Sequence, residues 1–140
     1  MQRFQCATPD TGGGFGQKAH IYPEEMLLPL LSRELDSPVK WIEDRRENLM
    51  AGIHAHEQNI DISYALDAGG RITGIRTNAL GDGGAYHMPP WTMAVEPWCA
   101  VVMTPTGIYD VPSVEYTYEA VATNKTPVGA YRGVGYMAGT

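Results

Sequence analysis

The sequence lacks a basic cluster, a long apolar run and a cysteine-rich segment, and each absence excludes a class of protein. With 10 basic against 16 acidic residues, and with Arg45 and Arg46 flanked by acids, the chain is not expected to bind nucleic acid. No apolar run is long enough to cross a bilayer. The two cysteines, Cys6 and Cys99, have no metal-ligand spacing, and this favours a reducing compartment such as the cytoplasm.

The histidines and acids supply no candidate catalytic group. His54 and His56 could line one face of a strand, but their spacing is not a zinc signature, so we expect packed or solvated side chains. The acids fall in expected helix starts or charged turns, which explains them as capping or solvated groups. They are Glu24, Glu25, Glu43 and Glu96.

What the sequence does have is glycine, most densely at residues 12–16 around a single aromatic, Phe15. Glycines remove side chains, so backbone N–H groups can approach an anionic ligand closely. The run matches neither the P-loop nor the dinucleotide fingerprint, because residues 17–19 lack what each requires. Lying between a strand-like segment at 4–7 and a helix-like segment at 22–35, it predicts a turn that binds a phosphate-like or oxo-like group.

A second glycine-rich turn at 128–135 carries one aromatic and one arginine, Tyr131 and Arg132. An isolated arginine is most often a surface ion pair. Its place in a glycine turn favours contact with an anionic ligand, for which its five fixed donors are suited. Phe15 and Tyr131 fit equally well as core aromatics, and the two roles are compatible.

Hydrophobic periodicity predicts a mixture of helices and strands. Alternating residues over 60–66, a turn at 67–70 and an apolar segment over 72–80 predict a hairpin. Hairpins with isolated helices indicate an α+β fold, with a mixed sheet and a few helices, rather than a doubly wound parallel sheet. The other expected features are a helix over 22–35 kinked at Pro29, a buried strand over 39–42, a helix or turn over 45–53, a sheet break over 81–85, a helix over 92–103 kinked at Pro97 and a strand over 114–120.

Three blocks in order, at residues 12–18, 39–48 and 130–133, resemble the molybdenum-binding large subunit of the xanthine dehydrogenase, aldehyde oxidase and aerobic carbon monoxide dehydrogenase family. The resemblance covers the chain, so residues 1–140 are expected to be a partial molybdopterin-binding domain of a larger subunit, either a split gene product or a truncated chain. It implies a cytoplasmic oxidoreductase with a molybdenum–molybdopterin cofactor, in the cytosine dinucleotide form, that takes oxygen from water. It also implies partner chains that carry iron–sulfur clusters and FAD.

The resemblance assigns roles to both glycine loops but no direct side-chain ligand to the metal. The general-base glutamate of the family is expected outside these 140 residues. The cofactor-binding residues it implies are Gly13, Gly14, Phe15, Gly16, Ala130, Tyr131, Arg132 and Gly133, and the substrate-pocket residues are Ala19 and Val134.

Departures from the family pattern bear on the substrate. Ala19 and Ala55 stand where purine-oxidising relatives carry a glutamate and an arginine, and Val134 replaces a phenylalanine that stacks on the substrate. Gly133 replaces the cysteine that holds copper in carbon monoxide oxidisers. We therefore expect an aldehyde or an N-heterocycle as substrate. The alternatives are a homologue of the carbon monoxide dehydrogenase large subunit, or a non-catalytic structural or assembly module of such a complex.

Overall fold

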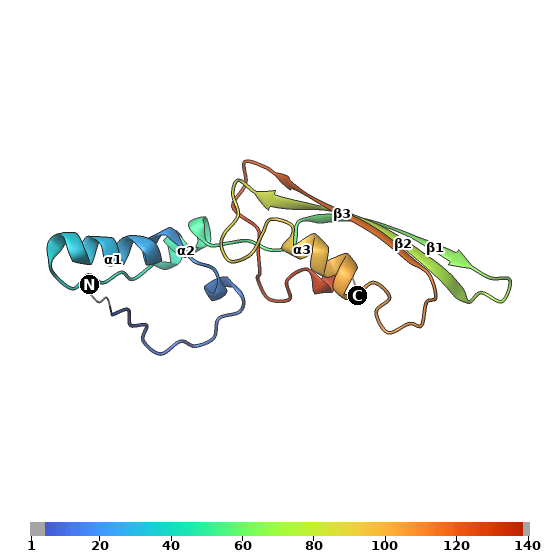
Figure 1. The fold of residues 1–140 in the computed structure, drawn as a ribbon, viewed down its shortest axis with the longest axis horizontal. Helices are drawn as coiled ribbons and strands as arrows, with labels where there is room; N and C mark the ends of the chain where they lie inside the picture. Colours follow the sequence, from blue (N-terminus) through green and yellow to red (C-terminus); the bar gives the residue numbers. More distant parts are fainter. Residues whose placement is uncertain (1–4, 139–140) are drawn as a thin grey trace.

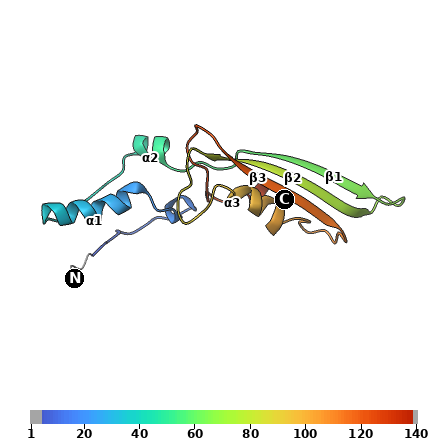
Figure 2. The same cartoon turned by 45° about the horizontal axis from the view of Figure 1, so that its top comes forward.

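The computed structural model describes residues 5–138 and is elongated. Figure 1 shows α1 and α2 at one end, the long strands at the other and α3 beside the sheet, and the turned view in Figure 2 agrees. The elements are η1 (Gln17–Ala19), α1 (Pro23–Leu35), α2 (Arg45–Ala51), β1 (Gln58–Leu66), β2 (Ile72–Gly84), α3 (Val95–Trp98), the π-helical segment η2 (Cys99–Met103), β3 (Val114–Ala122) and η3 (Tyr136–Ala138).

The sheet has the strand order β1-β2-β3. β1 and β2 are antiparallel, and the Asp67 carboxylate fixes their turn by accepting the N–H groups of Gly69 at 2.8 Å and Arg71 at 2.9 Å. β3 runs parallel to β2, with Ile75 opposite Val114. The hairpin, the strand over 114–120 and the mixed α+β fold are thereby confirmed.

The segment between β2 and β3 forms the crossover that a parallel pair requires, and it supplies the core. Ala79 of β2 packs with Ala100 and Val101 of η2, and all three are buried. A side chain on Gly81 would clash with Pro97 of α3, because a Cβ there would lie 2.8 Å from Pro97 Cγ. Residues 81–84 continue β2 and pair with β3, with one register irregularity between Asp82 and Gly84, so the expected break in the sheet is wrong.

The helices begin and end largely as the sequence indicates. The Tyr22 N–H, just before α1, bonds to the Glu25 carboxylate at 2.9 Å, and Pro29 lies inside α1 without ending it. Asp44 caps α2 by accepting the Glu47 N–H at 2.8 Å. The helix expected over 92–103 begins later, at Val95, and becomes π-helical after Trp98.

Two apolar segments that were expected to be strands are not. Residues 39–42 are irregular, with Trp41 48% and Ile42 73% exposed, so the buried strand is wrong. Residues 5–7 are also irregular, and Phe4 lies outside the described residues. A strand needs a neighbour to pair its N–H and C=O groups. Within the described part of the chain neither segment has one.

Candidate functional site

The two glycine loops, 12–16 and 130–135, meet through their backbones. The Arg132 N–H donates to the Phe15 carbonyl at 2.8 Å. Gly16, with φ of 85°, lies so close to the second loop that a Cβ would stand 2.5 Å from the Ala130 carbonyl oxygen. Side chains are excluded at this contact, so the loops can form one continuous backbone surface.

Strained backbone is concentrated at this contact. Phe15, His56, Arg132 and Val134 have φ of 52°, 64°, 38° and 46°, and they are four of the five non-glycine residues with positive φ within residues 5–138. The fifth, Asp36, is the ordinary C-cap of α1. Left-handed backbone costs free energy in side-chain-bearing residues, above all in a β-branched one such as Val134. Such strain is typical of functional sites.

The side chains of the loops leave a cation at the surface. The Arg132 guanidinium carbon lies 5.7 Å from the centroid of the Phe15 ring, and Phe15 is 59% exposed. No carboxylate pairs with Arg132 in the described part of the chain, so the surface ion pair that the sequence left open is not present there. Because Phe15 and Tyr131 are both exposed, neither is a core aromatic in this structure.

The remaining predicted residues surround the same contact. Gly13 lies against the Phe15 ring, with room for no Cβ, and the Gly14 carbonyl accepts the Lys18 N–H at 3.1 Å. Ala130 is buried, and the Gly133 carbonyl accepts the Tyr136 N–H at 2.9 Å. The structure thus brings the cofactor-binding set together as two touching loops, while their cofactor contacts stay a prediction.

Two further residues, Ala19 and Val134, were expected to line a substrate pocket. Ala19 is exposed at the end of η1, and its N–H donates to the Gly16 carbonyl at 2.9 Å. Val134 is half-buried in the second loop. Both lie beside the loop contact, but their roles toward a substrate stay predictions.

The loops fit an anionic group. No hydrogen bond within residues 5–138 uses the backbone N–H groups of Phe15, Gly16 or Gly133. These donors belong to the two loops that meet at the Arg132–Phe15 backbone bond, and the Arg132 side chain has no carboxylate partner in the described part of the chain. Backbone N–H groups and a guanidinium together form the donor set that phosphate and oxo groups require.

Sequence reasoning missed a buried carboxylate, that of Glu96, which contacts His56 beside the second loop. Glu96 is only 1% exposed, and its Oε2 accepts the backbone N–H of His56 at 2.8 Å. Its Oε1 lies 3.2 Å from His56 Nδ1, and the other ring nitrogen, Nε2, lies 3.4 Å from the Arg132 carbonyl oxygen. The expectation that Glu96 is solvated is therefore wrong.

Burial dominates the electrostatics of Glu96. It raises the pKa of this carboxyl above its ordinary value, and the hydrogen bond and charge of His56 only partly oppose the rise. A signal was available in the sequence, because Glu96 is the one charged residue between positions 83 and 109. An acid so isolated in an uncharged segment is seldom placed to meet solvent.

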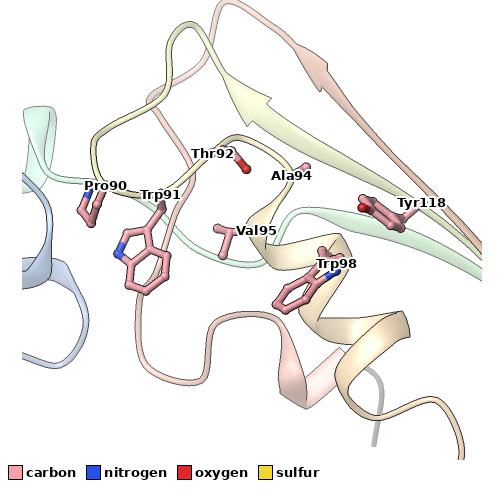
Figure 3. A pocket seen from close by; sticks show the side chains of 7 residues that line it. All are labelled: Pro90, Trp91, Thr92, Ala94, Val95, Trp98 and Tyr118. Atoms are coloured by element: carbon pink, nitrogen blue, oxygen red, sulfur yellow. The ribbon is translucent and has the colours of Figure 1, made fainter.

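Other features of the described residues lie apart from the loops. A cavity of about 330 Å³ opens at the start of α3, and Figure 3 shows two tryptophan side chains and Tyr118 around it. The cavity is lined by Pro90, Trp91, Thr92, Ala94, Val95, Trp98 and Tyr118, none of which belongs to either glycine loop.

Among residues 5–138, no three His, Cys, Asp or Glu side chains gather as a metal site. In the same residues, no helix is long and apolar enough to cross a membrane.

Comparison with known proteins decides the family. Residues 1–140 match the sequence profile described as the molybdopterin cofactor-binding domain. The chain belongs to this molybdopterin-binding family. It is 67% identical, over 99% of its length, to the nicotine 6-hydroxylase large subunit of Paenarthrobacter nicotinovorans, of which it covers 17%.

Two further relatives agree with the assignment. The crystal structure of quinoline 2-oxidoreductase from Pseudomonas putida 86 matches with a TM-score of 0.82 and 52% identity, over 91% of this chain and 16% of that one. The carbon monoxide dehydrogenase large chain of Hydrogenophaga pseudoflava is 35% identical over 93% of this chain and 16% of that protein. The chain thus spans about one sixth of the length of these relatives.

Proposed function

We propose that this chain is part of the molybdenum-cofactor-binding subunit of a molybdenum hydroxylase, an enzyme that oxidises its substrate with oxygen from water. The observation that carries the proposal is the contact between the two glycine loops, where Arg132 and Phe15 join through an N–H···O=C bond of 2.8 Å. The strained backbone, the unused N–H donors and the exposed guanidinium at this contact suit a bound anion.

The residues of this chain bind and orient rather than react. The backbone N–H groups of Phe15 and Gly16 hold anionic oxygens, and Arg132 neutralises their charge without losing its own proton. The Phe15 ring, whose centroid lies 5.7 Å from the guanidinium carbon, favours the cation at this position. When bound, the molybdenum–molybdopterin group supplies the redox chemistry. The general base is supplied by a glutamate outside these residues.

The proposal extends to the form of the cofactor and to the partner chains of the complex. The cofactor is the cytosine dinucleotide form, and electrons leave through iron–sulfur and FAD chains of a cytoplasmic complex. The names of the relatives refer to large and gamma subunits, which supports an assembly of several chains. The resemblance to bacterial members supports the cytosine form.

We favour an aromatic N-heterocycle as substrate over an aldehyde. Two similar proteins are named for nicotine and quinoline, both of which contain an aromatic nitrogen ring. Ala19 and Val134 have smaller side chains than the glutamate and phenylalanine that the resemblance places there in purine-oxidising relatives. Carbon monoxide is disfavoured because Gly133 offers no thiolate to bind copper.

The test is to purify the intact complex that carries this sequence, measure its metal content and identify the released pterin by mass spectrometry. We expect one molybdenum per large subunit and a cytosine dinucleotide pterin. Absence of molybdenum from a folded, fully assembled complex would contradict the proposal and favour the structural or assembly module. A different pterin form would contradict only the choice of dinucleotide.

A further inference from the structure

The Glu96 carboxylate is buried behind the second glycine loop, although nothing in the proposed function uses it. It lies in α3, in a segment that is otherwise uncharged from position 83 to 109. A buried carboxylate is unfavourable unless it is paired and hydrogen-bonded. Its partner is His56, a residue 40 positions earlier that itself has a left-handed backbone with φ of 64°.

The hydrogen-bonding atoms of Glu96 and His56 show how many protons the two side chains must share. Glu96 Oε1 and His56 Nδ1 lack hydrogen-bond partners among residues 5–138, and the two atoms face each other at 3.2 Å. On its other side, His56 Nε2 faces the Arg132 carbonyl at 3.4 Å. A carboxylate and a carbonyl are both acceptors, and neutral imidazole has one N–H. Both contacts are satisfied only when the pair holds one further proton, on His56 or on Glu96.

The pair connects directly to the joined loops. The Arg132 peptide is held at both ends, since its carbonyl faces His56 and its N–H donates to Phe15. Gly135, in the same loop, lies against the main chain of Glu96, and a Cβ there would overlap the Glu96 carbonyl oxygen. The second loop therefore contacts both α3, through Gly135, and the first loop, through Arg132.

We propose that Glu96 and His56 are positioning residues that hold the Arg132 peptide and so aim its guanidinium at the anionic cofactor. Glu96 holds the His56 backbone N–H through Oε2 and faces the ring nitrogen Nδ1 with Oε1, and the ring in turn braces the Arg132 carbonyl. This inference rests on the proposed function, because it requires that the second loop binds the cofactor.

The experiment compares Glu96→Gln with the control Glu57→Gln in the intact complex. Glu57 is an exposed acid that pairs with Lys125, outside the loops. The readouts are the rate of molybdenum release and the electron paramagnetic resonance spectrum of the partly reduced metal, with the thermal midpoint measured alongside. We expect Glu96→Gln to release molybdenum roughly 10-fold faster and to alter the spectrum, and Glu57→Gln to match the wild type.

A double-mutant cycle with Arg132→Lys separates positioning from a general loss of stability. If Glu96 acts through Arg132, then Glu96→Gln has little further effect on release once the guanidinium is gone. An equal fold-change in both backgrounds, or a Glu96→Gln variant that behaves like Glu57→Gln, overturns the inference. If Arg132→Lys alone leaves molybdenum release unchanged, the proposed function of the second loop fails instead.

A second variant keeps the test valid if Glu96→Gln does not assemble. His56→Gln removes the ring that lies between Glu96 and the Arg132 carbonyl, and His54→Gln changes an exposed histidine two positions away. We expect His56→Gln to reproduce the faster release and the altered spectrum, again only while Arg132 is present. Indistinguishable His56 and His54 variants would overturn the inference.

Discussion

At the scale of single residues, two glycines of the first loop differ in the space around their backbones. Gly16 has φ of 85° and touches the Ala130 carbonyl, whereas a Cβ on Gly12 would have no other atom within 4 Å. The two glycines come from the same run, so sequence alone does not distinguish them. Their different surroundings make them a matched pair for substitution.

We expect Gly16→Ala to separate the loops and Gly12→Ala to be tolerated. The added methyl would lie 2.5 Å from the Ala130 oxygen on a backbone that disfavours any side chain, at a cost of about 1–3 kcal/mol. The measurement is molybdenum content per purified complex, with the thermal midpoint as a second readout. Equal molybdenum content in the two variants would show that close contact of the loops is not required.

Arg132→Lys should lower cofactor occupancy in the assembled complex more than Lys18→Ala does. Lysine keeps the charge but loses the planar fork, and a hydrogen bond to a charged group contributes about 1.5–3 kcal/mol. We therefore expect on the order of a tenfold loss in cofactor affinity, measured as molybdenum content when cofactor is limiting. Arg71→Lys, in the exposed hairpin turn, serves as the matched control. Similar losses in the Arg132 and Lys18 variants would contradict the role given to the second loop.

At the scale of elements, a polar clamp holds the ends of β2 and β3 together. Asp82 accepts the Gly84 N–H at 2.8 Å and the Thr123 hydroxyl at 2.7 Å, and it pairs with Lys125 at 3.0 Å. Burial alone would raise the pKa of Asp82, but these hydrogen bonds and the lysine outweigh it and hold the pKa below its ordinary value. The clamp therefore works only while Asp82 is ionised.

The stabilisation that this clamp provides is expected to decrease at low pH. Because the folded pKa lies below the unfolded value of about 3.9, the stabilisation is complete above that value and is lost as pH falls through the folded pKa. We expect Asp82→Asn to lower the thermal midpoint of the complex at pH 7. The difference from wild type should shrink steadily below about pH 4. A difference that is constant from pH 7 to pH 3 would show that the charge of Asp82 is unimportant.

At the scale of the whole molecule, this chain exposes apolar surface over its helical end. Met26, Leu35 and Ile42 are 65%, 64% and 73% exposed, far more than an isolated domain normally leaves to water. The chain also spans about one sixth of its relatives. Both observations favour a segment that other parts of a large subunit cover.

The 140-residue chain purified alone should hold no stoichiometric molybdenum. Under the proposed function these two loops form only part of the cofactor site, and an anionic pterin needs its polar groups paired when it is buried. Metal analysis of the purified chain is the measurement. A molybdenum content of one per chain would contradict this expectation and would mean that these two loops suffice.

The substrate preference that we predict is that of the complete enzyme. The resemblance implies that Ala19 and Ala55 stand where purine-oxidising relatives carry charged partners, so we expect a purine to lose about 1–3 kcal/mol for each polar group left unpaired. We expect an aromatic N-heterocycle such as a pyridine or quinoline to be oxidised fastest, ahead of aldehydes, xanthine and carbon monoxide. A dye-reduction assay of the complex with each class measures this order, and xanthine or carbon monoxide in first place would refute it.

The amino-acid sequence by itself determined the local elements and the identity of the two loops. Period-two alternation and the Asp67 turn specify the hairpin, and caps such as Asp44 specify helix starts, because these depend on near neighbours. Three blocks in order, at residues 12–18, 39–48 and 130–133, were enough to indicate the family.

Tertiary structure alone decided which residues meet. Residues 39–42 had the composition of a strand but no neighbour to pair with among the described residues, whereas 81–84 had the composition of a break but continue β2 because they pair with β3. Glu96 and His56 are 40 positions apart, and only the crossover of α3 over the sheet buries one against the other. Pairing, burial and contact between distant segments are properties of the folded chain, since no local pattern states which segments will lie together.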